Sequence, residues 1–449
     1  MRRRKAFWKA SLAVLLSAAG IGAAAGWLYH TWEKIPDSIR IKAGIEQELT
    51  LNAPVTGEIY LEKDRLEEAL PALGTSAEPS AGLAAGSSAG LAAQAQVIPV
   101  NLSRPVTVTA SHTQEYTMDV KLFGVIPFKR VSVQVIPDQS LIPAGVPIGI
   151  YVRTDGILVI GQGEFEGLGN VTREPARHLL QAGDYILQAD GEKVESKAAF
   201  TRLVSEANGR ELVLTIRRDG QVFDVKVRPE QDRDGAYKLG IWIRDNAQGV
   251  GTMTYLKSDA SFGALGHGIN DADTAALMEV ESGSLYRTEI IAVKKGQDGT
   301  PGELTGVIDY NLENRIGTIE INSVEGIFGT LSREKADSIQ TAAMPVGLKQ
   351  DVHLGEAQIL CSVDGQTAPQ LYTVQIRAVH LNHDNVNRGI ELQVTDERLI
   401  RQTGGIVQGM SGSPILQDGK LVGAVTHVFV HDSTRGYGIF VETMLEHGA

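Results

Sequence analysis

Short runs of alternating apolar and polar residues dominate the chain after residue 97. A period of two predicts β-strands, because successive side chains of a strand point to opposite faces of a sheet. Turn residues separate nearly all of these runs, and helical spacing of apolar residues occurs only over 174–180, 196–207 and 334–342. We predict a mainly β protein, with strands in the C-terminal part at 249–256, 275–280, 290–293, 315–321, 359–363, 372–378, 389–394 and 421–430.

The N-terminal residues follow a different pattern. A basic segment, 1–9, precedes an uncharged apolar run over 10–29. About 20 apolar residues are enough to cross a bilayer as a helix, and Trp27 and Trp32 would then lie at the far interface. We therefore predict a transmembrane signal anchor over 10–29, with the rest of the chain exported. A cleaved signal peptide is the alternative, because residues 23–26 are small enough for a signal peptidase.

Changes in composition divide the remaining chain. Residues 36–68 alternate between apolar and polar positions and predict a small β segment. Residues 69–97 are mostly Ala, Gly, Ser and Pro, with the run Ser-Ala-Gly-Leu-Ala-Ala occurring twice, which predicts a flexible linker. Two further domains are expected over 98–245 and 246–449.

Composition and charge exclude several classes of function. Lys and Arg number 42 against 54 Asp and Glu, giving a net charge of −12, and no basic run follows the N-terminal one. Nucleic acid is therefore not expected as a partner. Cys361 is the only cysteine and cannot form an intramolecular disulfide or a thiolate metal centre. No His-Glu-x-x-His spacing occurs either, so we expect neither a cofactor nor a metal site.

Residues 186–194 place an Asp-Gly turn between apolar residues, directly before the predicted helix 196–207. Ser196 is suited to cap the start of that helix. This order of strand, turn and helix resembles a PDZ domain, with its core at about 126–230.

The PDZ resemblance implies a mode of peptide binding. In that family an extended peptide adds as a strand beside the sheet, and the matching residues here are Ile148, Gly149 and Ile150. The preceding loop, which in the family holds a free C-terminus, contains Pro147, and proline has no backbone N–H to donate. Recognition of a free C-terminus is therefore left open. The alternative is that this domain only packs on its neighbour.

The segment 404–415 carries the clearest candidate chemistry. It reads Gly-Gly-Ile-Val-Gln-Gly-Met-Ser-Gly-Ser-Pro-Ile and sets Ser411 between glycines. Glycines allow a tight turn that presents the hydroxyl, and the N–H groups of Gly409 and Ser411 could then converge on an oxyanion. Ser413 is the weaker candidate nucleophile, and a simple Gly/Ser turn is the alternative.

A serine hydroxyl needs a base to take its proton, so the motif predicts a nearby histidine. His267 lies between two glycines at the end of an apolar segment, as expected of an exposed turn. His427 and His431 could line a pocket, whereas His380 and His383 lie near a loop. An acid should orient the imidazole, and spacing alone leaves several candidates open: Asp271, Asp273, Asp309, Asp364, Asp384 and Asp396.

Three segments together resemble one family of enzymes. Residues 265–269, 405–414 and 434–440 are similar to the stage IV sporulation protein B (SpoIVB) serine peptidases of endospore-forming bacteria. The order of N-terminal segment, PDZ domain and peptidase domain is also that of the family. The resemblance implies that Ser411 is the nucleophile and His267 the general base. The family's acid precedes the serine by a short distance, which matches Asp396.

The resemblance also implies partners and a location. Members of the family are anchored by one helix in the forespore inner membrane, face the intermembrane space and are released after cleaving themselves. The released enzyme cuts the extracytoplasmic part of SpoIVFA, and this triggers processing of pro-sigma K. Expected partners are thus the protein itself, a SpoIVFA-like membrane regulator and the membrane.

The order His, Asp, Ser along an all-β, Gly-rich region is that of chymotrypsin, so we expect a chymotrypsin-like double β-barrel over 246–449. An active serine endopeptidase is the favoured function, because a binding domain needs neither a base nor an activated hydroxyl. The alternative is a catalytically silent PDZ adaptor that binds membrane-protein partners.

Overall fold

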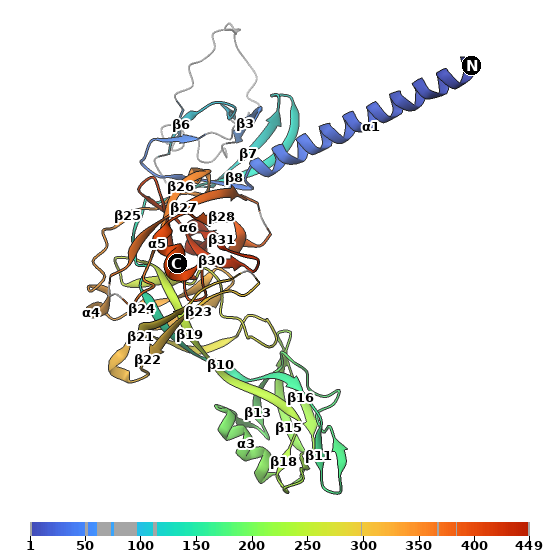
Figure 1. Ribbon diagram of the computed structural model, residues 1–449, viewed down its shortest axis with the longest axis vertical. Helices are drawn as coiled ribbons and strands as arrows, with labels where there is room; N and C mark the ends of the chain where they lie inside the picture. The colour runs from blue at the N-terminus through green and yellow to red at the C-terminus, as the bar shows by residue number, and fades with distance from the viewer. Residues whose placement is uncertain are drawn as a thin grey trace, which may run out of the picture. The chain divides into compact units, whose positions relative to one another are not determined.

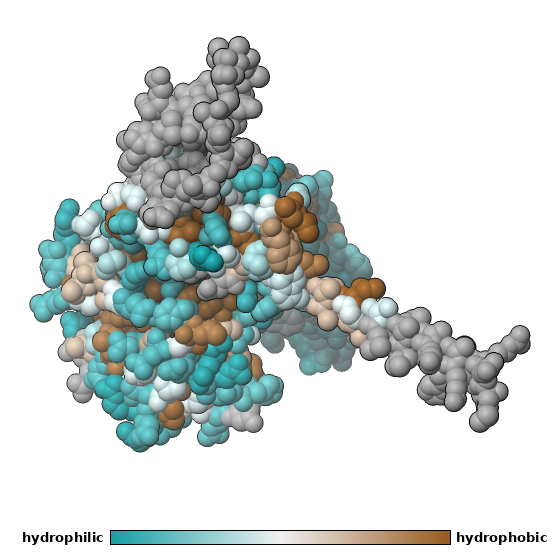
Figure 2. Space-filling view, turned by 90° about the horizontal axis from the view of Figure 1, so that it is seen from above, coloured by the Kyte–Doolittle hydropathy of each residue, from teal (hydrophilic) through white to brown (hydrophobic). Residues whose placement is uncertain are grey.

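The computed structural model describes residues 2–49, 53–60, 73–75, 97–110, 115–297, 299–365, 368–382 and 384–447 (Figure 1). Contacts divide the chain into two compact units. The first comprises Met1–Gln139, Leu348–His353 and Val379–Asn385, and the second comprises Ser140–Gly347, Leu354–Ala378 and Val386–Ala449. Hydrophilic residues predominate on the coloured part of the face shown in Figure 2.

The first unit is built on β-strands. Its larger sheet has the order β1-β8-β7-β3-β5, formed by Ser38–Lys42, Ile126–Ile136, Glu115–Leu122, Val55–Tyr60 and Val97–Asn101. A smaller sheet has the order β2-β6-β4, formed by Gln47–Leu49, Val106–Ala110 and Leu73–Thr75. Alternate residues such as Ile39, Met118 and Val131 are buried together in the core, as their period of two requires.

Two sequence-based boundaries fall differently in this unit. The small β segment predicted at 36–68 pairs with later strands, because β8 (Ile126–Ile136) lies between β1 and β7. From the sequence, β8 was expected to be the first strand of the PDZ core. The predicted linker, 69–97, lies outside the described residues except for β4 and the start of β5.

Helix α1 (Arg2–Lys34) packs its C-terminal turns on the β7–β8 hairpin. The Trp27 ring stacks on Phe123 with 5.9 Å between ring centroids, and Trp32 meets Phe128 edge-on at 5.4 Å. Lys129 donates to the carbonyl of Ile35 and lies over the Trp32 ring. These tryptophans therefore contact protein, whereas they were expected at a membrane interface.

Nowhere in the described part of the chain is a helix both long enough and apolar enough to cross a membrane. Residues 17–26 of α1 are mainly Ala and Gly, which carry little apolar surface. The predicted signal anchor over 10–29, and the single-pass location in the forespore inner membrane that depended on it, are therefore wrong.

The first barrel of the second unit is a ring of strands. β10 pairs with β21, which is followed around the ring by β23, β24, β20 and β19, and β19 returns to pair with β10. The strands are β10 (Pro147–Gln162), β19 (Ile241–Leu256), β20 (Ser261–Ala264), β21 (Val280–Lys294), β23 (Arg315–Ser323) and β24 (Gly326–Leu331). The edge of this sheet continues through β9 (Ser140–Pro143) to β25 (Met344–Pro345), and β22 (Glu303–Ile308) extends β21 as a hairpin.

A second barrel follows in the chain. It is closed in the order β26-β27-β28-β31-β30-β29. Its strands are Gly355–Cys361, Gln370–Val379, Ile390–Val394, Asp432–Phe440, Lys420–Phe429 and Pro414–Gln417, with α5 (Glu397–Thr403) before β29 and α6 (Val441–His447) after β31. Along the chain, α4 (Arg333–Ala336) and η3 (Lys349–Asp351) lie between the last strand of the first barrel and the first strand of the second. The 3-10 helix η2 (Leu312–Asn314) precedes β23, and η4 (Val386–Arg388) precedes β28.

A lobe is inserted between β10 and β19, and both strands continue from the first barrel into it (Figure 1). Its core surrounds Ile186, Phe200 and Leu214. Ser196 caps α3 (Lys197–Glu206) by accepting from Ala199 N–H at 3.2 Å, as the sequence predicts. The remaining strands of the lobe are β11 (Phe165–Gly167), β12 (Val171–Arg173), β13 (Tyr185–Ala189), β14 (Glu192–Lys193), β15 (Leu212–Arg218), β16 (Gln221–Val227), β17 (Glu230–Gln231) and β18 (Tyr237–Lys238).

The fold is thus mainly β, as predicted. The boundary drawn at residue 246 falls inside β19, which is one continuous strand from Ile241 to Leu256. The first barrel also uses Pro147–Gln162, a segment that precedes the predicted peptidase domain.

Candidate active site

His267 lies on a tight turn directly after β20. Leu265 and Gly266 have φ angles of 68° and 70°, a region that a non-glycine residue rarely adopts, so the surrounding packing holds this turn. A Cβ on Gly268 would approach the carbonyl oxygen of Ser323 to 2.5 Å, which leaves no room for another residue there. The glycines that suggested an exposed turn are thus required by close packing on one side.

The imidazole of His267 is held by its own backbone. Its Nδ1 lies 2.8 Å from the carbonyl oxygen of Gly268. Because a carbonyl oxygen only accepts, Nδ1 carries the proton and Nε2 keeps its lone pair. Burial of the ring lowers the pKa of His267, while the bond to Gly268 opposes that shift. The ring is therefore neutral at pH 7 and suited to accept a proton at Nε2.

Ser411 lies on a second tight turn, between α5 and β29. Gly409 and Gly412 have φ angles of 96° and 97°, which explains why glycine stands at both positions. The Ser411 hydroxyl donates to the carbonyl oxygen of Thr426 at 2.7 Å. Ser413 is fully buried, and its hydroxyl donates to the carbonyl of Met410 at 2.6 Å. Of the two serines, Ser411 is partly exposed whereas Ser413 is not.

The two turns lie against each other. Thr252 of β19 donates its N–H to the carbonyl oxygen of Ser411 at 2.9 Å and accepts from the N–H of Leu265 at 3.2 Å. A Cβ on Gly412 would lie 1.9 Å from the carbonyl oxygen of Thr252. The backbone of the Ser411 turn therefore packs directly against β19. The structure therefore brings together the loops of the predicted base and nucleophile, which are 144 residues apart by their numbers, 411 − 267.

The backbone N–H groups of the serine turn differ in whether they donate a hydrogen bond within the protein. Among the described residues, no hydrogen bond uses the N–H of Gly409 or Ser411, whereas the intervening Met410 N–H donates to Val407. The Thr252 hydroxyl donates to the carbonyl of Gly409 at 2.8 Å. On the other side, Leu304 N–H donates to the carbonyl of Gln408 at 2.8 Å. The turn is thus held through the carbonyl groups of Gln408 and Gly409. The N–H groups of Gly409 and Ser411 are left to donate to a ligand.

Asp396 does not meet His267. It caps α5, and its carboxylate accepts from the N–H groups of Arg398 and Thr373 and from the Arg398 guanidinium. The bonds from Arg398 are the main reason that the pKa of Asp396 falls to about 2. Within the described residues no hydrogen bond or ion pair links Asp396 to His267, so the structure does not support its predicted role as the orienting acid.

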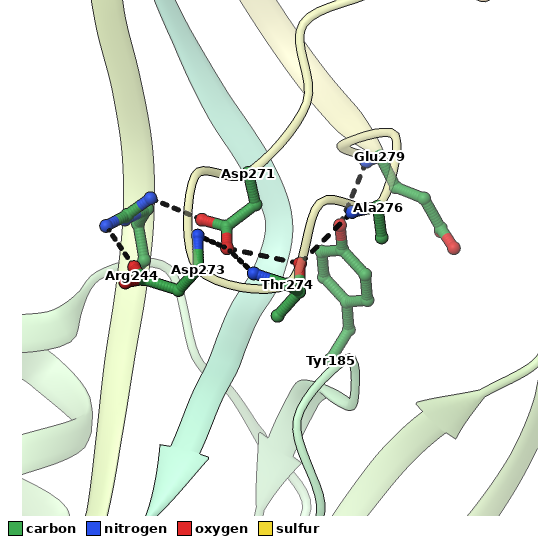
Figure 3. Close-up of polar contacts among 7 residues, drawn as sticks. All are labelled: Tyr185, Arg244, Asp271, Asp273, Thr274, Ala276 and Glu279. Carbon is green, nitrogen blue, oxygen red and sulfur yellow. Dashed lines mark hydrogen bonds and ion pairs between the residues drawn. The ribbon is translucent and has the colours of Figure 1, made fainter. Parts of the chain in front are cut away.

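Asp271, another of the candidate acids, is bound elsewhere (Figure 3). Its fully buried carboxylate forms an ion pair with Arg244 of β19 and accepts from Thr274 N–H at 2.9 Å and Asp273 N–H at 3.0 Å. Arg244 also pairs with Asp273 at 2.7 Å. Close by, the Tyr185 hydroxyl accepts from Glu279 N–H at 3.0 Å. Asp271 thus ties the loop after His267 to the inserted lobe and does not orient the imidazole.

The predicted peptide-binding residues are also placed differently. Ile148, Gly149 and Ile150 pair with β19 on one side and β21 on the other, so neither edge of that segment is open to a peptide. A groove of about 690 Å³ lies instead between α3 and the segment Ile241–Asn246 of β19. The alternation of Leu239, Ile241 and Ile243 is a strand signal that could have indicated this segment.

The comparisons with known proteins bear on the C-terminal region. Residues 235–445 match the SpoIVB peptidase family, peptidase S55. The chain is a serine peptidase. The SpoIVB peptidase region contains both His267 and Ser411, and the family favours an enzyme over a silent adaptor. A comparison with curated proteins gives no significant match.

Three solved structures are similar to parts of the chain. The PDZ domain of the SdrC-like protein from Listeria monocytogenes is 21% identical, covering 20% of this chain and 90% of that domain, with a TM-score of 0.17. The inactive form of the Rv3671c protease is 13% identical, with 44% and 81% coverage and a TM-score of 0.26. The HtrA-type protease AlgW with a decapeptide is 13% identical, with 49% and 56% coverage and a TM-score of 0.28.

The SpoIVB peptidase region also contains Cys361, the one cysteine of the sequence. Cys361 is buried, and burial raises the pKa of its thiol to about 12. Across the described residues, no three His, Cys, Asp or Glu side chains are grouped so that they could hold a metal ion.

Proposed function

We propose that the chain cleaves peptide bonds with Ser411 as nucleophile and His267 as general base. The observation that carries the proposal is the packing of the Ser411 turn and the His267 turn on the same residue, Thr252. The N–H groups of Gly409 and Ser411 are the donors of the oxyanion hole in this proposal. Their availability and the fixed turn between them support that role.

The reaction begins with the Ser411 hydroxyl turning from the Thr426 carbonyl toward His267. The hydroxyl proton passes to Nε2 of His267 while the oxygen forms a bond to the carbonyl carbon of the substrate. The carbonyl oxygen gains the negative charge and accepts from the two amides. His267 then gives its proton to the leaving amine as the C–N bond breaks, and water repeats the sequence to release the acyl group.

The groove beside α3 is the proposed site for an extended segment of the protein substrate. β10 pairs with one edge of Ile241–Asn246, and among the described residues no strand pairs with the edge that faces α3. A peptide added there would hydrogen-bond through its backbone and pack on Phe200 and Val204. The chymotrypsin-like double barrel belongs to this proposal too, and the closed strand rings support it.

The substrates proposed are the protein itself and a regulator resembling SpoIVFA, whose cleavage would trigger processing of pro-sigma K in sporulation. Membership of residues 235–445 in the SpoIVB peptidases supports this signalling role. The segment 69–97 is the proposed region of self-cleavage because of its Ala, Gly, Ser and Pro composition.

The test compares the full chain with Ser411→Ala, each incubated alone and followed by intact mass. We expect fragments from the parent, with a cut in or just before 69–97, and none from the folded variant. A parent that stays intact, or a variant that is cut equally, would refute self-cleavage by Ser411.

A further inference from the structure

A second histidine lies against the proposed general base. The rings of His267 and His427 have centroids 5.1 Å apart and are tilted by 38°. Within the described residues, no carboxylate bonds to His267, whose Nδ1 is held by Gly268. His427 is therefore the ring that packs against the proposed base, while the Gly268 carbonyl holds Nδ1.

An irregularity in β30 puts His427 there. Pairing between β30 and β31 is regular at Val425 and Gly438 but shifts before Val428 and Gly436, so that Thr426 and His427 lie at a bulge. Bulges re-aim side chains and are common beside active sites. Here the bulge directs the Thr426 carbonyl to the Ser411 hydroxyl, at 2.7 Å, and the next side chain to the His267 ring.

The bulge is tied to the turn that carries His267. The Thr426 hydroxyl donates to the carbonyl of Asn387 at 2.6 Å. The Asn387 amide donates in turn to the carbonyl of Gly266 at 2.6 Å and to that of Val324 at 2.9 Å. The side chains of Thr426 and Asn387 are both buried. A buried network of this kind fixes the two rings relative to each other, because each member has its partner.

We propose that His427 is a positioning residue for the general base: its ring packs on the imidazole of His267 and holds it for proton transfer from Ser411. The inference rests on the proposed function of His267 and Ser411. Contact between the rings restricts rotation of His267, and an uncharged ring beside it does not repel the imidazolium that forms when Ser411 loses its proton.

The charge of His427 agrees with this role. Partial removal from water, the neighbouring His267 and Arg388 together lower the pKa of His427 to about 4. Arg388 itself lies over the ring of Tyr437. At neutral pH the ring of His427 is therefore uncharged and does not repel an imidazolium on His267.

The experiment uses the full chain and an alkyl fluorophosphonate, which phosphonylates activated serines with loss of fluoride. The maximal rate and the probe concentration at half-maximal rate are measured separately for the parent, His427→Phe, His427→Ala and His431→Ala. We expect His427→Ala to lower the maximal rate about tenfold with the half-saturating concentration unchanged, and His427→Phe to stay within about threefold of the parent. His431→Ala, a matched change a few residues along, should react like the parent.

Three outcomes contradict the proposal in different ways. If His427→Ala reacts as fast as the parent, His427 does not position the base. If His427→Phe is as slow as His427→Ala while folded by circular dichroism, ring packing is not the cause. If the parent leaves Ser411 unlabelled, the proposed function itself fails, and the inference with it.

Discussion

The backbone N–H of Thr252 donates to the carbonyl oxygen of Ser411 over 2.9 Å. Thr252 lies near the C-terminal end of β19, whose first residues, Ile241–Asn246, line the groove beside α3. One continuous strand thus contacts both the proposed peptide groove and the turn that carries the nucleophile.

The Thr252 hydroxyl gives a first test of how the serine turn is held. Thr252→Val keeps the shape of the side chain but leaves the Gly409 carbonyl without its donor at 2.8 Å. We expect a loss of about 1–3 kcal/mol in the free energy of unfolding and slower phosphonylation of Ser411. The control is Thr254→Val on the same strand, because the Thr254 hydroxyl is buried and has no hydrogen-bond partner among the described residues. That variant should be as stable as the parent or more so, and equal losses in both variants would contradict the assignment.

Gly412 tests the packing of the turn on β19. Gly412→Ala places a methyl group 1.9 Å from the carbonyl oxygen of Thr252 and forces the alanine to adopt a φ of 97°. Gly419 has a similar φ of 73° but nothing within 4 Å of its Cβ position. We expect Gly419→Ala to cost about 1–2 kcal/mol of unfolding free energy from backbone strain alone, and Gly412→Ala to cost clearly more and abolish phosphonylation. Denaturant unfolding of both variants checks this, and similar costs would argue against the close approach.

Burial of His267 sets the pH dependence of the reaction. The base must be neutral to accept a proton, and burial lowers the pKa of His267 below its usual value of about 6.5. The rate of phosphonylation should therefore rise with pH through a midpoint below 6.5 and be near its maximum at pH 7. A midpoint above 7, measured as rate against pH, would contradict this and would mean that a nearby acid stabilises the charged form of the base.

Asp271 and Asp273 both pair with Arg244, but their replacement should lower the free energy of unfolding by different amounts. Asp271 is fully buried, whereas half of the Asp273 side chain is exposed, at 50%. Asp271→Asn leaves Arg244 without its buried partner, and breaking such a pair costs about 3–5 kcal/mol. Asp273→Asn should cost less than about 1 kcal/mol. Urea unfolding of the two variants decides the matter, and the reverse order would contradict the arrangement in Figure 3.

Asp396 should affect stability at low pH and leave catalysis nearly unchanged. Arg398 lowers the pKa of Asp396 to about 2 in the folded chain, below the usual value of about 3.9. Its stabilising contribution is therefore complete above pH 4 and is lost as the pH falls toward 2. Asp396→Asn should remove that part of the acid dependence, while phosphonylation per folded molecule at pH 7 stays within a few-fold of the parent. Complete loss of reaction in folded Asp396→Asn would restore Asp396 as a catalytic acid.

The features that could be predicted are those encoded over short stretches. Alternation located most strands, and Ser196 marked the start of α3. Glycines marked the turns of His267 and Ser411, because tight turns and close approaches exclude other residues. The brief helix expected over 174–180 forms only turns, and that expected over 334–342 shrinks to α4, since neither has a long apolar face to bury.

Long-range pairing explains what the sequence could not show. β10 and β19 pair across an inserted lobe, with Ile150 opposite Gly249, and no local pattern reports such a register. The peptide groove was therefore assigned to the wrong strand. The position of Asp396 was misjudged for a related reason. Distance along the chain does not reveal that its carboxylate caps a helix and binds Arg398. The aromatic residues of α1 have protein partners that hydropathy alone does not record.

The most direct measurement is to treat the full chain with an alkyl fluorophosphonate and locate the phosphonylated residue by peptide mass spectrometry. Modification of Ser411 in the parent, its absence in Ser411→Ala and a strongly slowed reaction in His267→Ala are the predicted result. A folded parent that is unmodified at Ser411, or is modified at Ser413 instead, would contradict the assignment of Ser411 and His267 as nucleophile and base.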